Sequence, residues 1–449
     1  MKNSRMEAMH RSLSRGLRIF FDTLTGQSVD WHTKYFVKTQ WMKKKELQQL
    51  QLKKLKKLLV YAYEKVPFYH KSFVKRGLRP TDFRTLADLR KVPILRKSDI
   101  RDNLAQLVST DYSKSDLQVF TTSGTSATPL NIYRSMLDLS WARGAESRGY
   151  GWGGYRLGDK MALIWGFPPE QARGARFKFY HFLTRQRILN VNLMSDSSMR
   201  SFATRLVRFK PDFVRGYATA SNVFANFLLK NRQFKIRPKA AFTSAATLLP
   251  HYRKTIQKAF NCKVYDVYGS REISGTAAQC GQHEGLHVSD EIVVLEIIKD
   301  GETASVGEEG QIYLTNLHSF AMPFIRYDIG DIAKSFADDC PCGRKLSLVK
   351  PFGRTYEYLV NSDGTFTALR DLQQVFEGMP IVDFQIEQKD FDEIIVRIVP
   401  KMGYNQTHTD FITENIKLRG KARIRVDLVD AIPTERSGKT KLIIRRVGG

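Results

Sequence analysis

The chain has 449 residues, 42% of them hydrophobic, which is enough to form a sizeable core and more than one domain. No apolar run approaches the roughly 20 residues of a membrane-spanning helix, and the basic N-terminus is a poor secretory signal, so we expect a cytoplasmic protein. The net charge of +27 predicts attraction to an anionic partner, such as nucleic acid, an acidic membrane surface or phosphorylated ligands.

Residues 1–110 are rich in lysine, leucine and arginine and predict helices. The densest basic segment is residues 43–57, KKKELQQLQLKKLKK, in which leucines recur at helical spacing with lysines between them. This pattern predicts an amphipathic helix with a solvated basic face, and the alternative is a helix that binds a membrane surface or a polyanion. The first 21 residues could rest on a membrane interface or form an accessory basic helix.

From about residue 117 the sequence alternates between short apolar strands and helical segments, which indicates an α/β sheet with buried strands. We expect strands at 161–165, 213–217 and 264–268, and helices at 198–209, 219–231 and 250–260. Residues 288–299 and 310–317 predict a more antiparallel region. After residue 354 the expected elements are those of a small α+β domain, with strands at 382–388, 393–399 and 422–429 and a helix at 405–418.

Residues 121–130, TTSGTSATPL, combine hydroxyls with a glycine directly after an expected strand. The hydroxyls and backbone N–H groups of such a run can converge on phosphate oxygens, and Gly124 lets the backbone approach closely. The segment is not a Walker A loop, because no Gly-Lys-Ser/Thr follows. Taken alone, it favours a surface turn over a phosphate-binding loop.

Two later segments place polar side chains beside glycine turns. In residues 265–272, YDVYGSRE, Tyr268 ends an expected strand and could stack on a planar base, and Glu272 could hold Mg²⁺ beside phosphates. In residues 324–331, FIRYDIGD, Asp331 follows a glycine and could accept hydrogen bonds from both hydroxyls of a ribose. Each segment also fits an ordinary strand end with a surface acid.

Two more segments carry cations near expected boundaries. Arg354 follows Gly353 where the composition changes, and Lys439 lies on a Ser-Gly-Lys turn near the C-terminus. A lysine on such a turn can reach an anion as a mobile point charge. Each segment alone is unremarkable in composition, and the order of all five along the chain is the informative feature.

The ordered set TTSGTSATPL, YGSREI, YDIGD, GR and SGK resembles the adenylate-forming ligases. Within this superfamily the chain looks like the phenylacetate–CoA ligase branch, and more closely like the subgroup of capsular-polysaccharide-biosynthesis ligases. The resemblance implies a large N-terminal α/β domain with a small mobile α+β C-terminal lid. We therefore expect three parts: a helical part at 1–110, an ATP- and substrate-binding α/β part at 111–353, and the lid at 354–449.

The resemblance also implies a role for each segment. The loop around the β- and γ-phosphates of ATP would consist of Thr122, Ser123, Gly124, Thr125 and Ser126. The nucleoside would contact Ser244, Ala245, Ala246, Tyr268, Gly269, Ser270, Asp331 and Arg354, with Tyr268 on adenine and Asp331 on ribose. Glu272 would coordinate Mg²⁺ near the α-phosphate. Lys439 would contact the acyl carboxylate and the α-phosphate as the catalytic cation.

The expected cofactors and partners are ATP, Mg²⁺, a small carboxylic acid, and CoA or another acyl acceptor, with no nucleic acid. The expected acyl pocket draws on the strand-end residues Trp165, Phe167, Gly216 and Tyr217, whose aromatic rings favour an aryl or otherwise apolar acid. The high positive charge also allows peripheral attachment to an anionic membrane.

The sequence departs from the family pattern after Arg354. The usual pair of carboxylates is missing: only Glu357 keeps an acid, and Tyr356 occupies the expected hinge. Residues 360–365 also differ from the glycine-containing segment that serves the thioester-forming conformation. These departures concern CoA as acceptor more than adenylation. The alternative is an adenylyltransferase, or a ligase in polysaccharide or cofactor biosynthesis that transfers the acyl group without CoA.

Cysteines and histidines form two short clusters. Cys280 precedes His283 and His287, and Cys340 and Cys342 follow about 60 residues later. This spacing suits one structural Zn²⁺ on Cys280, His287, Cys340 and Cys342, with His283 as the alternative nitrogen ligand. Reduced cysteines that bind nothing are the other interpretation.

A third hypothesis is a basic protein that binds nucleic acid or membrane and carries vestigial ligase segments. The intact Lys439, Glu272 and Asp331 argue against it, and no RNA-binding signature supports it. The sequence therefore favours an ATP-dependent ligase that activates a carboxylate.

Overall fold

The computed structural model describes most of the chain, in nine stretches: residues 2–122, 130–167, 174–282, 284–337, 339–354, 358–361, 366–416, 422–434 and 440–447. The chain forms two compact units. Unit 1 comprises residues 1–160, 180–185 and 265–351, and unit 2 comprises residues 161–179, 186–264 and 352–449. No helix in these stretches has the length and apolar character needed to span a lipid bilayer.

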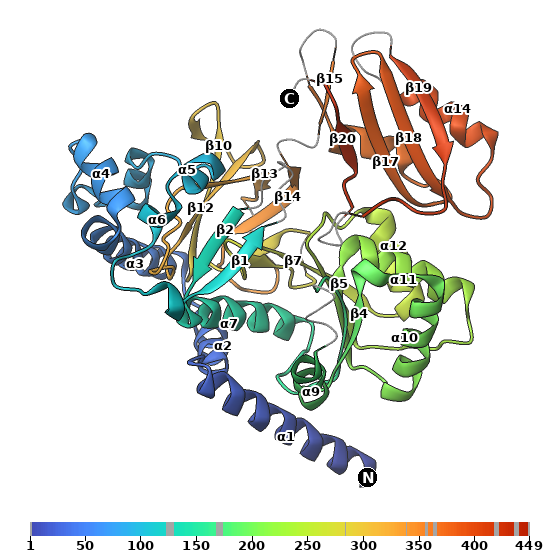
Figure 1. The fold of residues 1–449 in the computed structure, drawn as a ribbon, viewed down its shortest axis with the longest axis horizontal. Helices are drawn as coiled ribbons and strands as arrows, with labels where there is room; N and C mark the ends of the chain where they lie inside the picture. Colours follow the sequence, from blue (N-terminus) through green and yellow to red (C-terminus); the bar gives the residue numbers. More distant parts are fainter. Residues whose placement is uncertain are drawn as a thin grey trace. The chain divides into compact units, whose positions relative to one another are not determined.

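The beginning of unit 1 is helical, as its composition predicts (Figure 1). The helices are α1 (Lys2–Leu24), α2 (Val29–Thr39), α3 (Lys44–Lys65), α4 (Pro67–Lys75), α5 (Lys97–Asp102), α6 (Leu104–Leu107) and α7 (Met136–Trp152), with short 3-10 turns at Pro80–Asp82, Leu86–Lys91 and Lys114–Asp116. Helix α3 buries Leu47, Leu55, Leu58 and Leu59 and exposes most of its lysines, which confirms the predicted amphipathic helix.

One lysine of α3 departs from this solvated pattern. The Nζ of Lys54 donates to the backbone oxygen of Glu291 at 2.7 Å and lies 2.9 Å from Nε2 of His318. Loss of hydration on burial lowers the pKa of Lys54 to about 8. Charge spacing alone could not single out this lysine, because its partners come from a strand-end segment far along the chain.

The strands of unit 1 form an antiparallel hairpin and a larger, mainly antiparallel array. The hairpin pairs β1 (Gln118–Thr122) with β2 (Leu130–Arg134). The array has the order β11-β10-β12-β13-β14-β9-β8-β7. Its strands are β7 (Lys263–Tyr268), β8 (Ala277–Ala278), β9 (Leu286–Val288), β10 (Val293–Lys299), β11 (Glu302–Thr303), β12 (Glu309–Asn316), β13 (Tyr327–Ser335) and β14 (Leu348–Arg354). The antiparallel pairing of β10 with β12 confirms the region predicted at 288–299 and 310–317.

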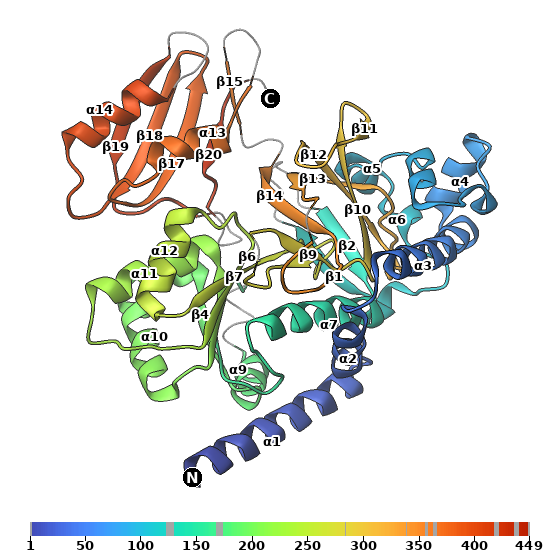
Figure 2. The ribbon, with the colours of Figure 1, turned by 180° about the vertical axis from the view of Figure 1, so that it is seen from behind.

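The first part of unit 2 is a parallel sheet with helical crossovers, as the alternating sequence predicts. The strand order is β6 (Ala240–Ser244), β5 (Phe213–Tyr217), β3 (Met161–Trp165) and β4 (Gln186–Asn190). Helices α10 (Asp196–Phe209), α11 (Ala218–Lys230) and α12 (Pro250–Phe260) lie together on one side of these strands (Figure 2). The connection between β3 and β4 carries α9 (Ala175–Leu183), and a 3-10 turn at Val191–Leu193 follows β4. Parallel pairing brings the carboxyl ends of the strands to one edge.

The last part of unit 2 contains a four-stranded sheet in the order β19-β18-β17-β20. The elements are the β15 (Tyr358–Val360) and β16 (Phe366–Ala368) hairpin, α13 (Leu369–Gln373), a 3-10 turn at Gln374–Phe376, β17 (Ile381–Asp390), β18 (Glu393–Pro400), α14 (Gln406–Asn415), β19 (Arg423–Leu428) and β20 (Ile443–Arg445). The predicted strands at 382–388, 393–399 and 422–429 are thus confirmed. The predicted helix at 405–418 ends earlier, at Asn415.

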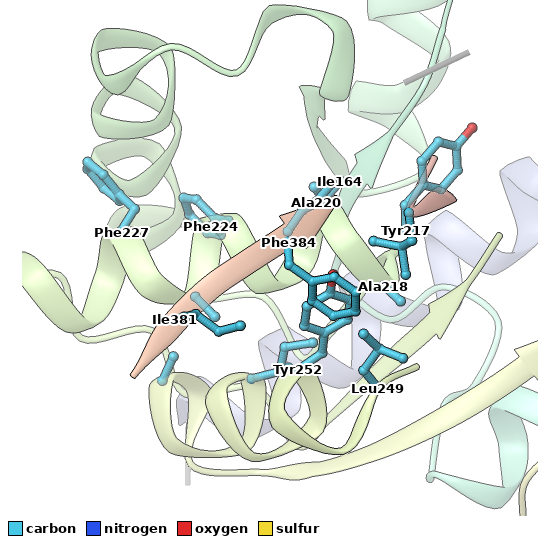
Figure 3. Close-up of a cluster of buried hydrophobic side chains, with 14 of the residues drawn as sticks. Ile164, Tyr217, Ala218, Ala220, Phe224, Phe227, Leu249, Tyr252, Ile381 and Phe384 are labelled. Carbon is cyan, nitrogen blue, oxygen red and sulfur yellow. The ribbon is translucent and has the colours of Figure 1, made fainter. Parts of the chain in front are cut away.

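Both parts of unit 2 share one hydrophobic core. Ile381 and Phe384 of β17 lie among Ala218 of α11, Tyr252 of α12 and Leu249, which precedes α12 (Figure 3). Two polar bonds cross the same core: the Tyr252 hydroxyl donates to Asp383, and Nδ2 of Asn222 donates to the Val382 carbonyl at 2.8 Å.

Candidate active site

The aromatic and acidic residues expected around a nucleoside meet in unit 1. Tyr268 is the last residue of β7, and Asp331 lies in β13 with 8% of its surface exposed. The Tyr268 hydroxyl donates to Oδ2 of Asp331 at 2.7 Å, across 63 positions of sequence. An aromatic ring and the carboxylate that is expected to bind ribose are therefore held side by side.

The predicted metal ligand Glu272 is also held by a tyrosine. The Tyr327 hydroxyl donates to Oε1 of Glu272 at 3.0 Å, and both side chains are buried. Burial raises the pKa of Tyr327 well above its ordinary value, so the phenol stays protonated and serves as a donor at neutral pH. No role was predicted for Tyr327, although it starts the same YDIGD segment that contains Asp331.

A tight turn presents Glu272. Ser270 and Ile273 exchange two hydrogen bonds of 3.0 Å, one from each backbone N–H. Gly275 ends the turn with φ of +73°, and a Cβ there would meet the Ala142 carbonyl oxygen at 2.6 Å. Only glycine fits both the left-handed backbone and the close approach of α7. The two bonds and Gly275, all within the GSREISG segment, therefore shape the turn.

Arg134 anchors this turn through hydrogen bonds, a role that was not predicted. Its guanidinium donates to Oγ of Ser274 at 2.8 Å and to the Arg271 carbonyl at 3.3 Å. It also forms a 2.8 Å ion pair with Asp138, and both side chains are only 2% exposed. A buried charge is costly unless it is paired, so this arrangement fixes the turn relative to β2 and α7. The four-residue spacing of Arg134 and Asp138 was the available signal.

Arg271 links the same turn to the predicted phosphate loop. Its guanidinium donates to the carbonyl of Thr121, in the strand that leads into the hydroxyl-rich segment. Ser123, Gly124, Thr125 and Ser126 themselves lie outside the described residues, as does Lys439, and the side chains of Thr122 and Arg354 are not described. The roles of these residues therefore stay predictions.

Arg326 holds the start of β13, and its role was likewise not predicted. It has φ of +51°, is 6% exposed and forms a 3.2 Å ion pair with Glu296. The guanidinium also donates to the carbonyls of Arg90 and Val92, both at 3.0 Å. These bonds tie the segment before Tyr327 to the helical region and so set the position of Tyr327 and Asp331.

The residues expected around the acyl group lie in unit 2 at the carboxyl ends of the parallel strands. The rings of Trp165 and Tyr217 meet edge to face with centroids 4.7 Å apart, and the Arg215 guanidinium lies over the Trp165 ring at 4.5 Å. Asn190 fixes the Phe167 backbone through a 2.8 Å bond from its Nδ2 to the carbonyl. These contacts join the ends of β3, β4 and β5 through one ring pair and one bond to the backbone.

Two other predicted positions have special backbone environments. At Gly216 a Cβ would lie 2.9 Å from Cβ of Ile164, so this position allows β5 to approach β3 closely. Ala245, in the stretch Ser244–Ala246 expected along the adenine, has φ of +70°. A left-handed conformation at a non-glycine residue costs roughly 1–2 kcal/mol, and such strain concentrates at ligand sites.

Three cysteines and a histidine form a compact cluster in unit 1. One ligand atom from each of Cys280, His287, Cys340 and Cys342 lies within 4.8 Å of the others. The Sγ atoms of Cys280 and Cys340 are 3.5 Å apart, and Sγ of Cys342 is 3.3 Å from Nε2 of His287. A tetrahedral zinc with Zn–S bonds of about 2.3 Å separates its ligand atoms by about 3.8 Å, so the cluster matches this ion in size and donor type. The alternative ligand, His283, lies outside the described residues.

The cluster is next to Tyr268 and Asp331 within the sheet. His287 of β9 pairs with Ala278 of β8, and the neighbouring Ala277 pairs with Tyr268. Cys340 and Cys342 follow β13, which carries Asp331. The cluster therefore joins two segments. One contains β8 and β9, which follow β7 and Tyr268, and the other follows β13 and Asp331.

An arginine clamp supports the CPCGR segment. The Arg344 guanidinium lies over the rings of Trp41 and Trp152, at 4.7 and 4.8 Å. Its Nε donates to Oε1 of Gln40 at 2.9 Å, and Nε1 of Trp152 donates to the same oxygen at 2.8 Å. The Trp152 ring also meets His287 edge to face at 5.3 Å. Cation–π contacts thus hold the segment that carries two of the cysteines.

Comparisons with known proteins agree with this architecture. The CapK C-terminal domain family matches residues 359–446. Phenylacetate-coenzyme A ligase from Aromatoleum evansii is 27% identical over 327 residues, which cover 70% of this chain and 72% of that protein. Protein CapK from Staphylococcus aureus is 24% identical over 425 residues, which cover 90% of each chain.

Among solved structures, 2-hydroxyisobutyryl-CoA ligase in the postadenylation state, in complex with R3-HIB-AMP, has a TM-score of 0.75 at 20% identity and covers 91% of each chain. An anthranilate CoA ligase in complex with anthranoyl-AMP has a TM-score of 0.53 at 16% identity, covering 74% of this chain and 66% of that one. The predicted α/β class is confirmed: the chain has the fold of the adenylate-forming CoA ligases and carries a CapK C-terminal domain.

Proposed function

We propose that this protein is an ATP-dependent ligase that converts a carboxylic acid to an acyl-adenylate and passes the acyl group to a thiol or another acceptor. The observation that carries the proposal is the paired arrangement of Tyr268 with Asp331 and of Tyr327 with Glu272. The similarity to phenylacetate–CoA ligases and the shared fold support the same reaction class.

In the proposed reaction a carboxylate oxygen bonds to the α-phosphorus of ATP, the bond to the β-phosphate breaks and pyrophosphate leaves. Tyr268 supplies a ring for adenine, and Asp331 accepts hydrogen bonds from the ribose hydroxyls. Glu272 would hold Mg²⁺, which when bound offsets charge on the phosphates. Lys439 would offset the charge that develops between the carboxylate and the α-phosphate, where electrostatic stabilisation contributes most.

The second half of the proposed reaction moves the acyl group from AMP to the acceptor. CoA is the acceptor that the relatives' names suggest, and the altered segment after Arg354 keeps a carrier thiol, an amine or a hydroxyl as alternatives. The rings of Trp165, Phe167 and Tyr217 would contact the acyl group, and they favour an apolar or aryl acid.

We also propose that the cluster of Cys280, His287, Cys340 and Cys342 holds a structural Zn²⁺. A closed set of four such ligands, with no fifth acidic partner needed, is typical of structural sites. The ion would fix the segments beside β8, β9 and β13. Metal analysis of protein never exposed to chelator should give about one zinc per chain; a value near zero contradicts the proposal.

Pyrophosphate release from a panel of carboxylic acids, with and without CoA, tests the function. We expect one class of acid to stimulate release, and CoA-dependent formation of AMP identifies a thiol acceptor. ATP turnover that no acid stimulates contradicts the ligase and supports an adenylyltransferase.

Lys439→Ala tests the catalytic cation. Loss of this charge should lower the rate of adenylate formation by about a hundredfold while ATP binding stays nearly unchanged. Lys441→Ala, two residues away, is the matched control, and equal rates in wild type and Lys439→Ala would remove Lys439 from the mechanism.

A further inference from the structure

Helix α1 is fixed to unit 1 through one of its faces. Glu7 forms ion pairs with Lys160 at 2.6 Å and with Arg185 at 2.7 Å, and Arg11 forms one with Asp159 at 2.6 Å. The hydroxyl of Ser14 donates to the Leu183 carbonyl at 3.1 Å. The hydrogen bond from Lys160, with help from Arg185, lowers the pKa of Glu7 to about 2, so the acid is ionised at any physiological pH. The rotation of the helix about its axis is thus set by several bonds.

The opposite face of α1 presents an exposed apolar stripe. It consists of Met9, Leu13, Phe20 and Leu24, with 62%, 62%, 58% and 67% of their surfaces exposed. Spacings of four, seven and four residues place these side chains in one row along the helix. Because the docked face is held by ion pairs, the stripe cannot turn inward without breaking them. An apolar row of this length is characteristic of an interaction surface.

The surroundings of the stripe are basic and contain exposed tryptophans. The first 65 residues contain fifteen lysines and arginines against five acids. On α2 and directly after it, Trp31 and Trp41 are 58% and 55% exposed, and Lys34 and Lys38 are exposed too. Tryptophan prefers the headgroup level of a bilayer, and lysines near the surface favour anionic lipids.

We propose that α1 binds in the plane of an anionic lipid membrane, with its apolar stripe at the boundary between headgroups and acyl chains. The net charge of +27 complements an anionic surface and opposes the approach of a second copy of the same chain. A helix that lies on the membrane needs only such a stripe and basic surroundings, not an apolar segment of spanning length. The ligase would then work beside the membrane without crossing it.

Vesicle binding by the full-length protein tests this proposal. The probes are vesicles of phosphatidylcholine with phosphatidylglycerol and vesicles of phosphatidylcholine alone. The stripe variant carries Leu13→Asp and Phe20→Asp. The control carries Val74→Asp and Val306→Asp, which lie off α1, are 56% and 61% exposed, and change the net charge equally. Melting temperature and pyrophosphate release report that both variants remain folded.

We expect wild type to bind the anionic vesicles and to be released by salt. The stripe variant should bind about a hundredfold more weakly, because two apolar side chains no longer leave water, and the control should lose only a few-fold. Equal loss in both variants would overturn the proposal, since charge alone would then explain binding. Self-association that the stripe variant abolishes, without vesicle binding by wild type, would instead assign the stripe to a second copy.

Discussion

The residues proposed for the nucleotide and those proposed for the acyl group are built in different ways. On the nucleotide side, Tyr268, Asp331, Tyr327 and Glu272 are joined in pairs by hydrogen bonds whose directions fix each side chain. On the acyl side, Trp165 and Tyr217 meet through ring edges, and Asn190 fixes only backbone. Hydrogen bonds specify one geometry, whereas ring contacts tolerate shifts. The nucleotide side therefore suits one invariant ligand, and the acyl side suits a group that differs among related enzymes.

Among the substitutions that test this contrast, replacing the Glu272 carboxylate should have the largest effect on the rate of pyrophosphate release. Glu272→Gln keeps an oxygen that can accept from Tyr327 but removes the charge proposed to hold Mg²⁺. We expect the rate of pyrophosphate release to fall by about a hundredfold or more. Tyr327→Phe is the matched variant, because it keeps the charge and removes only the positioning bond; we expect about a tenfold loss and a higher Mg²⁺ requirement. Equal losses would show that Glu272 acts only through its position.

Two substitutions at Tyr268 distinguish the contribution of ring stacking from that of the hydrogen bond to Asp331. Tyr268→Ala removes both the ring and the bond to Asp331, and we expect KM for ATP to rise by about tenfold or more. Tyr268→Phe keeps the ring, so KM for ATP should rise only a few-fold. Steady-state kinetics at saturating acid measure both values. If the phenylalanine variant is as impaired as the alanine variant, the hydrogen bond rather than stacking is the important contribution.

Replacing Trp165 should change the kinetic constants for the acid and leave those for ATP nearly unchanged. Trp165→Ala removes a ring that contacts Tyr217 and the Arg215 guanidinium, and we expect kcat/KM for the acid to fall by about tenfold. KM for ATP should stay within twofold of wild type. Phe213→Leu, in the core of β5, is a control for general damage to the sheet. A rise in KM for ATP equal to the effect on the acid would refute the division into two sides.

The sequence predicts the residues of short motifs but not the residues that hold them in place. Tyr268, Glu272 and Asp331 lie in short segments with glycine turns, and their order along the chain predicts that they share a site. Arg134, Arg326 and Tyr327 were missed because their partners Ser274, Glu296 and Glu272 reach them only through tertiary contacts. Parallel and antiparallel strands were predictable from apolar patterning, since buried strands differ from helices in length and residue type.

The Cys/His cluster was predictable for a different reason. Thiols and imidazoles are rare in this chain, so Cys280, His287, Cys340 and Cys342 can be recognised as candidate metal ligands without knowing the strand order. The packing of β17 against α11 and α12 was not predictable in this way. Ile381 and Phe384 are ordinary apolar residues, and nothing in their spacing identifies the helices that cover them. Rare side chains therefore reveal tertiary contacts that common apolar residues do not.

The smallest expected effect is on stability, and it concerns a polar pair in the core of unit 2, Tyr252 and Asp383. Asp383 accepts hydrogen bonds from the Tyr252 hydroxyl and from the Phe384 backbone, and burial raises its pKa from 3.8 to about 6. Between these two values the folded state binds more protons than the unfolded state. The contribution of Asp383 to stability must therefore fall as pH rises through this window and stay constant above it.

Asp383→Asn should remove this pH dependence, because an amide stays neutral while its oxygen can still accept both bonds. Thermal melts of the full chain from about pH 4 to about pH 7 give the wild-type and variant curves, and their difference isolates residue 383 from every other titrating group. We expect the variant to gain stability relative to wild type as pH rises through the window. The slope is the decisive quantity, since an unpartnered amide N–H₂ in the core shifts the variant by the same amount at every pH. A difference that does not change with pH would mean that Asp383 keeps one protonation state throughout this window, and it would contradict the raised pKa of the buried carboxyl.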